Sequence, residues 1–463
     1  MQILLVAPIS KTHYIVPPIG LGYLASALRR SEFQSVGVLD CVKERFKFQD
    51  FESFLEKEKP EVVGFQVFSY DFARVKRSID LVRKIIPDAL VVVGGPHVSA
   101  TAETVLQELP EADFGIWGEG EENFPLLLKK VLKGDNIRFE DIPGLIWREN
   151  AKVGVNQRTF IENLDSLEFP AWDLLKPQAY PDNPQGAFYK NFPIAPLSTS
   201  RGCPYHCTFC ASFTNMGRRL RLRSIQNVLA EMELLHHDYG IREFHIVDDM
   251  FNLYKDRVRE FCEGLKARKL EVSYTFPNGL RLNTLDRDIL KLMKETGAYA
   301  FTVGIESGSP RILKHMKKEL TLEMIEDKVN LINEAGLEPS GFFVIGYPAE
   351  KKEDIEKTIR LAKKLKLKRA HFGNFLPLPG TEATEQLLKD GEIGRLDWES
   401  MFYSKVPYSP RGMTKKELKK LQRKAFLSFH LRPRILLKML SEIKSPRHLR
   451  AVLKRGWDYL FVD

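Results

Sequence analysis

The sequence predicts an α/β protein in which a doubly wound, Rossmann-like parallel sheet is followed by a partial (β/α)6 barrel and a helical C-terminal region. Apolar β-like runs alternate with amphipathic helical stretches early in the chain, and the same alternation returns later. The length of 463 residues also exceeds what one hydrophobic core usually holds. We therefore divide the chain into a first domain, a linker with a hairpin insertion, a barrel and a basic helical region, at 1–135, 136–193, 194–395 and 396–463.

In the first domain, runs rich in Val, Ile and Leu indicate strands that are buried on both faces of a sheet. Ligands of such sheets bind beyond the carboxyl ends of the strands. A glycine pair, Gly94 and Gly95, follows a central strand and allows a ligand to approach the backbone closely. The expected strands are 2–8, 35–40, 61–69 and 89–95, with helices at 20–30 and 72–86 and a further helix opening near Thr101.

The linker and the barrel follow from a change in pattern. Residues 136–193 contain "GLIWRENAKVGVNQ", which indicates a small hairpin, and then a stretch rich in proline and aromatic residues. Six further strand and helix pairs over about 200 residues suit a partial barrel, whose active site faces the carboxyl ends of its strands. The expected strands are 194–202, 243–249, 272–279, 299–306, 340–346 and 370–377.

Charge is concentrated at the C-terminus. Residues 413–463 hold 14 Lys and Arg against 4 Asp and Glu, so their net charge of +10 leaves −1 for the rest of the chain. A neutral body argues against a broad nucleic-acid-binding face. The basic amphipathic tail could lie on an anionic membrane, contact an acidic partner or pack on the barrel, and packing is favoured. Its apolar residues include Phe426, Phe429, Leu436, Leu437, Leu440, Trp457 and Phe461.

Three of the five cysteines, Cys203, Cys207 and Cys210, lie within eight positions just after the first barrel strand. A [4Fe–4S] cluster held by three thiolates keeps one iron open to a small molecule. Zinc would recruit a histidine, and His206 is poorly spaced to chelate together with its neighbour Cys207. Few, scattered remaining cysteines exclude a disulfide scaffold and favour a reducing cytoplasm.

The motif "CPYHCTFC" resembles the signature of the radical S-adenosylmethionine (SAM) superfamily, Cys-x3-Cys-x-aromatic-Cys, with Phe209 in the aromatic place. The resemblance implies that SAM occupies the open iron through its amino and carboxylate groups. It also implies that the reduced cluster cleaves SAM and releases a 5′-deoxyadenosyl radical. An electron donor of the flavodoxin or ferredoxin type is then needed.

The same resemblance implies SAM contacts at the strand ends. Asp248 and Asp249 stand where the family often carries Gly-Gly-Glu, and the alternative role of this aspartate pair is to cap the N-terminus of a helix. Arg281 would pair with the SAM carboxylate or with Glu306 in a salt bridge, and Ile345 would pack on adenine. The implied SAM contacts are Phe209, Asp248, Asp249, Asn278, Arg281, Glu306, Ser307 and Ile345.

Three segments of the first domain, "PPIGLGYLASALR", "VVVGGPHVSA" and "WGEGEENF", resemble the cobalamin-binding domain that precedes the barrel in a large radical SAM subgroup. The Asp-x-His-x-x-Gly motif that supplies a cobalt ligand elsewhere is absent, so His97 is expected near the ligand and not on cobalt. The alternative is a scaffold that binds no corrin. The implied contacts are Ser69, Tyr70, Gly94, Gly95, Pro96, His97, Gly118, Glu119, Gly120 and Glu122.

The resemblance implies a cobalamin-dependent radical SAM enzyme that methylates an unactivated carbon of a small-molecule or lipid-like substrate. The same architecture could instead catalyse a radical cyclisation or rearrangement. A non-catalytic metal-binding module that contacts acidic partners is the alternative from another class. Methylthio transfer is less expected because the first domain has only one cysteine, Cys41. A peripheral membrane contact through the basic tail would suit a lipid-like substrate.

Overall fold

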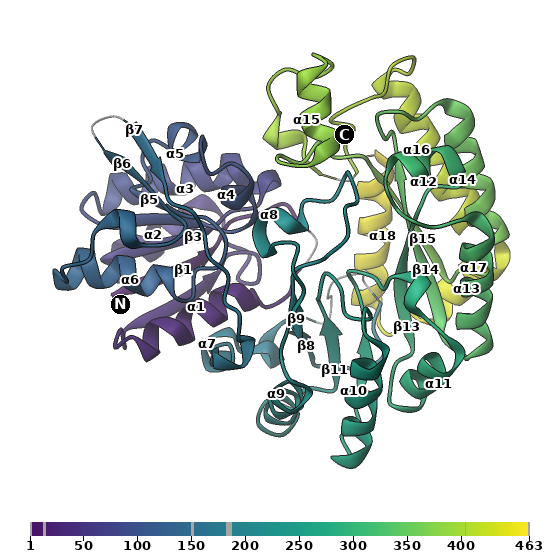
Figure 1. Cartoon of the computed structure of the whole chain (residues 1–463), viewed down its shortest axis with the longest axis horizontal. Coiled ribbons are helices and arrows are strands. Elements are labelled where there is room, and N and C mark those ends of the chain that lie inside the picture. The colour runs from purple at the N-terminus through teal and green to yellow at the C-terminus, as the bar shows by residue number, and fades with distance from the viewer. Residues whose placement is uncertain (1, 13–14, 150–151, 182–187, 403, 462–463) are drawn as a thin grey trace. The chain divides into compact units, whose positions relative to one another are not determined.

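The computed structural model describes residues 2–12, 15–149, 152–181, 188–402 and 404–461. The chain forms two compact units, whose elements are labelled in Figure 1. The first unit comprises Met1–Pro181 with Ala211–Arg223, and the second comprises Asp182–Cys210 with Ser224–Asp463. The chain therefore passes from the second unit to the first at the peptide bond after Cys210.

The first unit contains a seven-stranded sheet in the order β2-β1-β3-β4-β5-β6-β7. The first five strands in this order are parallel, and the hairpin β6–β7 continues the sheet antiparallel. The predicted parallel sheet is confirmed, and the hairpin that the sequence places in a linker instead continues this sheet beside β5. The strands are β1 (Ile3–Ala7), β2 (Val36–Asp40), β3 (Val62–Gln66), β4 (Leu90–Gly94), β5 (Phe114–Ile116), β6 (Leu145–Glu149) and β7 (Lys152–Val155).

Helices cover both faces of this sheet, as in a doubly wound fold. Helices α1 (Ile19–Arg30) and α6 (Asn123–Leu128) share one core with β1 residues. On the other face, Phe51 of α2 (Phe48–Glu58) packs its ring against Phe65 of β3, and α3 (Phe72–Ile85) packs on α2. Shorter helices are α4 (Pro96–Ala100), α5 (Val105–Glu108), α7 (Trp172–Leu175) and α8 (Ser212–Met216).

The expected helix opening near Thr101 instead begins five residues earlier, at Pro96. Gly95 has φ 99°, a left-handed conformation that ends strand β4 abruptly. Proline is favoured at the first helical position because its missing N–H has no helical partner there. This turn therefore sits directly at the carboxyl end of a central strand.

The second unit contains the predicted barrel strands in two parallel sheets, β8-β11-β12 and β13-β14-β15. Isolated bridges from Tyr274 to Ala298 and from Leu280 to Val303 connect the two sheets. The barrel strands are β8 (Ile194–Leu197), β11 (Glu243–Ile246), β12 (Ser273–Thr275), β13 (Ala300–Glu306), β14 (Glu338–Ile345) and β15 (Arg369–Asn374). Two further short strands are β9 (Ser200–Arg201), which follows β8, and β10 (Arg221–Leu222), which follows α8.

Helices follow the barrel strands, and several open on a side-chain cap. Ser224, Asp286 and Thr381 each accept a hydrogen bond from the backbone of the first helical turn. The helices are α9 (Ile225–Asp238), α10 (Lys255–Ala267), α11 (Arg287–Glu295), α12 (Pro310–His315), α13 (Leu322–Glu334), α14 (Lys352–Lys364), α15 (Glu382–Lys389), α16 (Lys415–His430), α17 (Pro433–Ser441) and α18 (Pro446–Phe461).

The C-terminal helices pack on the barrel. Phe429 of α16 is fully buried against Phe372 of β15, and Gln422 donates to the Phe372 carbonyl over 2.9 Å. Lys438 of α17 pairs with Glu338 at the start of β14. Within the described residues, no helix is both long and apolar enough to span a bilayer.

Candidate active site

The three clustered cysteines lie on one loop, Gly202–Cys210, which we call the cluster loop. Their side chains are half-buried, and the five cysteines of the chain form no disulfide. Burial raises the pKa of the Cys203 thiol, the charges of Asp249 and Cys207 raise it further, and Arg281 opposes them. Asp249, Cys207 and Arg281 therefore each lie close enough to act on Cys203.

Thr208, in the middle of the cluster loop, anchors it to the barrel. Its N–H donates to the Met316 carbonyl over 3.2 Å, and its carbonyl accepts from the Ala383 N–H over 2.9 Å. Its hydroxyl lies 2.8 Å from the Tyr347 hydroxyl. Phe209 packs on the apolar cluster that contains Tyr347. The loop is thus held from three elements while its thiols stay accessible.

The three thiols of the cluster loop suit an iron–sulfur cluster, because cysteine thiolates are the usual ligands of [4Fe–4S] centres. Among the described residues, no group of three or more His, Cys, Asp or Glu side chains converges closely enough to ligate one metal ion. Each thiolate of a [4Fe–4S] cluster binds a different iron, so its ligands stay further apart than those of tetrahedral zinc. His206, the candidate fourth zinc ligand, is exposed on the loop.

The structure separates the roles of the two adjacent aspartates after β11. Asp248 is buried and accepts hydrogen bonds from the Thr199 N–H over 2.6 Å, the Thr199 hydroxyl over 2.5 Å and the Ser200 hydroxyl over 2.6 Å. It therefore holds the loop that follows β8 and does not cap a helix. Asp249 is exposed and acts electrostatically on Cys203, so it is the one of the two aspartates with a connection to the cluster loop.

Glu306 and Lys318 form a shielded ion pair at the end of β13. The Lys318 Nζ lies 2.8 Å from the Glu306 Oε1. Glu306 has φ 67°, and the register of β13 shifts between Gly304 and Glu306. Such strain and irregularity are common where a strand aims a side chain into a functional site.

Lys318 is a site residue that the sequence analysis missed. Burial works to lower its pKa, but the negative charges of Glu306 and Cys207 outweigh burial, so the pKa is raised and the ammonium persists. A Cβ atom at Gly304 would lie 2.5 Å from the Glu306 Oε1 and 2.6 Å from the Lys318 Nζ. A side chain at this position would therefore displace the ends of both members of the pair.

Arg281 supports the cluster loop through Tyr205. Its guanidinium lies 3.3 Å from the centre of the Tyr205 ring, a cation–π contact. Its Nη2 donates to the Glu319 carboxylate over 2.8 Å and to the Lys318 carbonyl over 3.0 Å. Of the two predicted roles of Arg281, the salt bridge with Glu306 is wrong, because the guanidinium pairs with Glu319 instead. Asn278, on the same segment, donates to the Val247 carbonyl over 2.7 Å.

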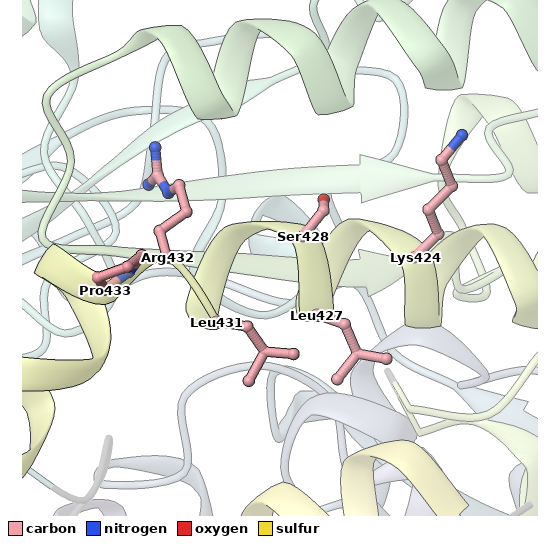
Figure 2. Close-up of a pocket in the computed structure, with 6 residues that line it drawn as sticks. All are labelled: Lys424, Leu427, Ser428, Leu431, Arg432 and Pro433. Carbon is pink, nitrogen blue, oxygen red and sulfur yellow. The ribbon is translucent and has the colours of Figure 1, made fainter.

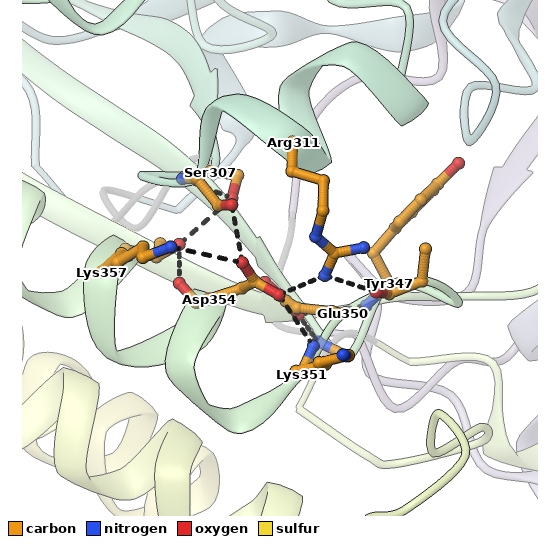
Figure 3. A network of polar contacts seen from close by, with 11 residues as sticks. Ser307, Arg311, Tyr347, Glu350, Lys351, Asp354 and Lys357 are labelled. Carbon is orange, nitrogen blue, oxygen red and sulfur yellow. Dashed lines mark hydrogen bonds and ion pairs between the residues drawn. The ribbon is translucent and has the colours of Figure 1, made fainter.

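Ser307 and Ile345 are fully buried beneath the strand ends. The Ser307 hydroxyl lies 3.2 Å from the Thr358 hydroxyl, within a polar network that Figure 3 shows around Asp354. Glu350 belongs to the same region. Its Oε2 accepts from the Gly346 N–H over 2.6 Å, and burial raises its pKa to about 8.

In the first unit, several predicted cobalamin contacts gather at the carboxyl ends of β3 and β4. The Ser69 hydroxyl lies 3.0 Å from the His97 Nδ1, and both side chains are buried. Burial lowers the pKa of His97 to about 4, so the imidazole is neutral. Tyr70 stacks on Phe68 with ring centres 5.4 Å apart. A Cβ at Gly95 would lie 3.2 Å from the Val67 nitrogen.

The remaining predicted cobalamin contacts follow β5. Gly118 has φ 91° and donates its N–H to the Ser99 hydroxyl over 3.0 Å. Glu119 is buried and accepts from the Ile161 N–H over 2.8 Å, whereas Glu122 is exposed. Together, Gly94, Gly95, Gly118 and Gly120 leave this sheet edge poor in side chains. Glycines at the carboxyl ends of central strands let a large ligand such as a corrin approach the backbone closely.

A glycine-rich edge on a doubly wound sheet, followed by a partial barrel with three thiols on its first loop, defines a cobalamin-binding radical SAM enzyme. Residues 6–128 match the B12 binding domain, and residues 197–362 match the radical SAM superfamily. An uncharacterised methyltransferase of Pyrococcus horikoshii is 35% identical over 95% of this chain and 92% of its own length. The chain belongs to the radical SAM superfamily, in the group with a B12 binding domain, and uses a [4Fe–4S] cluster, SAM and cobalamin.

Other relatives differ in the reaction that their names give. The cytidylyl-2-hydroxyethylphosphonate methyltransferase of Streptomyces wedmorensis is 29% identical over 81% of this chain and 78% of its own length. The anaerobic magnesium-protoporphyrin IX monomethyl ester cyclase of Cereibacter sphaeroides is 25% identical over 87% of this chain and 65% of its own length. The solved structure of OxsB, a cobalamin-dependent SAM radical enzyme, shares the fold with a TM-score of 0.76 at 17% identity, covering 98% of this chain and 70% of that one.

Proposed function

We propose that this enzyme transfers a methyl group from SAM to an unactivated carbon of a small-molecule or lipid-like substrate. The observation that carries the proposal is that one chain combines the glycine-rich ends of β4 and β5, which we call the corrin-type sheet edge, with a cluster loop that holds three thiols. When bound, cobalamin supplies a methyl carrier, and the reduced cluster supplies the electron that cleaves SAM. The names of the two methyltransferase relatives support methyl transfer over the other reactions of this architecture.

We assign the groups around the cluster loop to binding SAM. Lys318 and Arg281 carry positive charge that suits the SAM carboxylate, and Asp249 carries negative charge that suits its ammonium group. Glu306 holds Lys318 in place over 2.8 Å. Thr208 keeps the thiols in position through its three contacts with the barrel.

Radical cyclisation is the second candidate, and the cyclase relative favours it. The two candidates differ in the fate of the SAM methyl group. The test supplies SAM with an isotopically labelled methyl group, hydroxocobalamin and a low-potential reductant to the anaerobically reconstituted enzyme, together with extracts of small molecules and lipids. Methyl transfer predicts a product that gains the label. Turnover that yields only unlabelled product would overturn methyl transfer, and the Cys207→Ala variant should yield neither product.

Reduction of the cluster requires an electron donor, and we propose a flavodoxin or ferredoxin in a reducing cytoplasm. A cluster bound by three thiolates with one open iron is readily oxidised, which supports that location. Reduced flavodoxin should replace a chemical reductant in anaerobic SAM cleavage. Failure of both reduced flavodoxin and reduced ferredoxin to support turnover would contradict this assignment.

We also propose that the C-terminal helices contact an anionic lipid surface. Most of the large apolar side chains exposed in the described residues lie in or beside α16–α18, and basic residues stand between them. Figure 2 shows Leu427 and Leu431 projecting side by side at a groove of about 610 Å³ that Lys424 and Arg432 also line. The exposed apolar residues are Leu427, Leu431, Leu436, Leu437, Leu440, Leu449, Leu453 and Trp457.

This apolar and basic composition matches a helical surface that lies in a membrane interface. The full chain should co-sediment with vesicles that contain phosphatidylserine, more weakly at high salt, and not with phosphatidylcholine alone. Replacing Leu437 and Leu440 by serine should abolish co-sedimentation, whereas Leu388→Ser, at an exposed leucine of α15, should not. Self-association that the same double variant removes, without vesicle binding, would point to a second copy of the chain instead.

A further inference from the structure

The segment Ala211–Arg223 directly follows the cluster loop and belongs to the first unit. It is held there by residues that follow β4 and β5. Ser99, in helix α4 after the glycine pair, donates its hydroxyl hydrogen to the Asn215 Oδ1 over 2.8 Å. The same hydroxyl oxygen accepts from the Gly118 N–H over 3.0 Å. One serine therefore connects the turns that follow β4 and β5 to the segment that follows Cys210.

A buried ion pair holds the other end of this segment. The Arg221 Nη1 lies 2.6 Å from the Glu119 Oε2, and both side chains are at most 3% exposed. Arg221 also donates to the Ile161 carbonyl over 2.7 Å and to the Met216 carbonyl over 3.0 Å. A buried pair with this many additional hydrogen bonds keeps its geometry, because moving either partner leaves a charge unpaired.

A third side chain braces the middle of the segment. Arg158 donates to the Thr214 and Phe213 carbonyls, and its guanidinium packs over the Trp117 and Phe160 rings. Helix α8 is short, so these outside contacts determine its position more than its own hydrogen bonds do. Its first residues are joined covalently to Cys210 through Ala211.

The two predicted cofactor sites are thus connected along the chain. The turns with Gly94, Gly95 and Gly118 belong to the predicted cobalamin site. These turns hold the segment Ala211–Arg223, and Cys210 immediately precedes that segment. Any ordering of the turns by a bound corrin restricts Ala211–Arg223, and hence the backbone of Cys210. The contacts lie within the first unit, so they need no particular placement of the second.

We propose that Ser99–Asn215 and Glu119–Arg221 form a tether by which cobalamin occupancy stabilises the cluster loop. Asn215 and Arg221 are positioning residues, because each acts through a partner, Ser99 or Glu119. The tether orders the third cysteine when the corrin is in place, so the cluster is best protected in the enzyme that can use it. This inference goes beyond the proposed methyl transfer and does not depend on which substrate the enzyme accepts.

The test is the rate at which an iron chelator removes iron from the cluster-loaded full chain, with and without saturating hydroxocobalamin. Couplings between sites are commonly fivefold or larger, so we expect cobalamin to slow iron release by about fivefold in the wild type. Asn215→Ala should remove most of that protection. Asn215→Asp keeps an oxygen that accepts from Ser99 and should restore it, a rescue that general destabilisation does not predict.

Control variants separate the effect of the tether from a general loss of stability in the first unit. Arg221→Lys should behave like Asn215→Ala, whereas Arg83→Lys, which perturbs a less buried pair of the same length with Asp113 elsewhere in the same unit, should retain the protection. Hydroxocobalamin affinity is measured for each variant by absorbance, so that every chain is compared at saturation. Equal protection in the wild type and in Asn215→Ala, or no protection in the wild type, would overturn the proposal.

Discussion

At the scale of single residues, the site depends on a positive charge held beside the thiols. Lys318 is kept protonated by Glu306 and Cys207 despite its burial, and the strained backbone of Glu306 aims the carboxylate at it. No sequence pattern singles out this lysine, because "KHMKKEL" offers four basic residues and the relevant one depends on a bulge in β13. Likewise, the sequence places Asp248 and Asp249 together, and only burial separates their roles.

Lys318→Met should weaken SAM binding by about tenfold or more, because a charge-assisted hydrogen bond contributes about 1.5–3 kcal/mol. The iron content of the reconstituted cluster should stay unchanged, since the lysine is not a ligand. Equilibrium dialysis with the anaerobic protein measures the affinity. Lys317→Met, which removes an exposed neighbour paired with Glu382, is the matched control and should bind SAM normally. Unchanged SAM affinity in Lys318→Met would remove this residue from the site.

Gly304→Ala should reproduce the loss of SAM affinity without touching a charge. The added methyl group would lie against the Glu306 carboxylate and the Lys318 ammonium, so the ends of both side chains must shift from the geometry seen here. Gly394→Ala introduces the same methyl group where no atom lies within 4 Å and serves as the control. If Gly304→Ala binds SAM as tightly as the wild type, the geometry of the pair is not what SAM recognises.

At the scale of elements, the turns after the parallel strands carry both the chemistry and the less predictable features. The apolar runs predict β3, β4 and β13–β15 well, because buried parallel strands need continuous Val, Ile and Phe. Helix α2 was not predicted, although Phe51 and Leu55 recur at helical spacing on its buried face. Helix α4 begins earlier than expected at Pro96, because it starts directly after the turn at Gly95. The turn from β14 to α14 depends on Glu350, which binds the Gly346 and Tyr347 N–H groups while buried.

Glu350 gives this turn a defined pH dependence. Burial raises the pKa of Glu350 from its ordinary 4.5 to about 8, so between these values the folded chain binds more protons than the unfolded chain. The stability from this group is therefore fully present below about pH 4.5 and is lost as pH rises to about 8. Between about pH 6 and pH 8, the wild type should lose about 2 kcal/mol of unfolding free energy relative to Glu350→Gln.

Hydrogen exchange of β14 amides, corrected for the intrinsic effect of pH on exchange, measures this difference. Glu353→Gln removes an exposed carboxyl from the start of the same helix and should follow the wild type. A wild type and a Glu350→Gln variant with parallel pH profiles would show that Glu350 is ionised throughout this range.

At the scale of the whole molecule, the order of the two predicted α/β domains and the spacing of three cysteines carry the resemblance that indicates the class of enzyme from sequence alone. The sequence could not show that Ala211–Arg223 folds with the first unit, because this depends on Ser99, Glu119 and Arg158, which are distant along the chain. The sequence also does not identify the substrate. The charged groups near the thiols are all assigned to SAM, so no residue is left that indicates the chemistry of the substrate. The class therefore rests on the cluster loop and its contacts.

Anaerobic SAM cleavage tests this claim most directly. The reconstituted full chain, supplied with a reductant, should convert SAM to 5′-deoxyadenosine and methionine. Replacing Cys203, Cys207 or Cys210 by alanine should abolish that product, whereas Cys41→Ala and Cys262→Ala, at the two buried cysteines outside the loop, should still form it. A wild-type chain that assembles the cluster and forms no 5′-deoxyadenosine, or a Cys207→Ala variant that still forms it, would contradict the account.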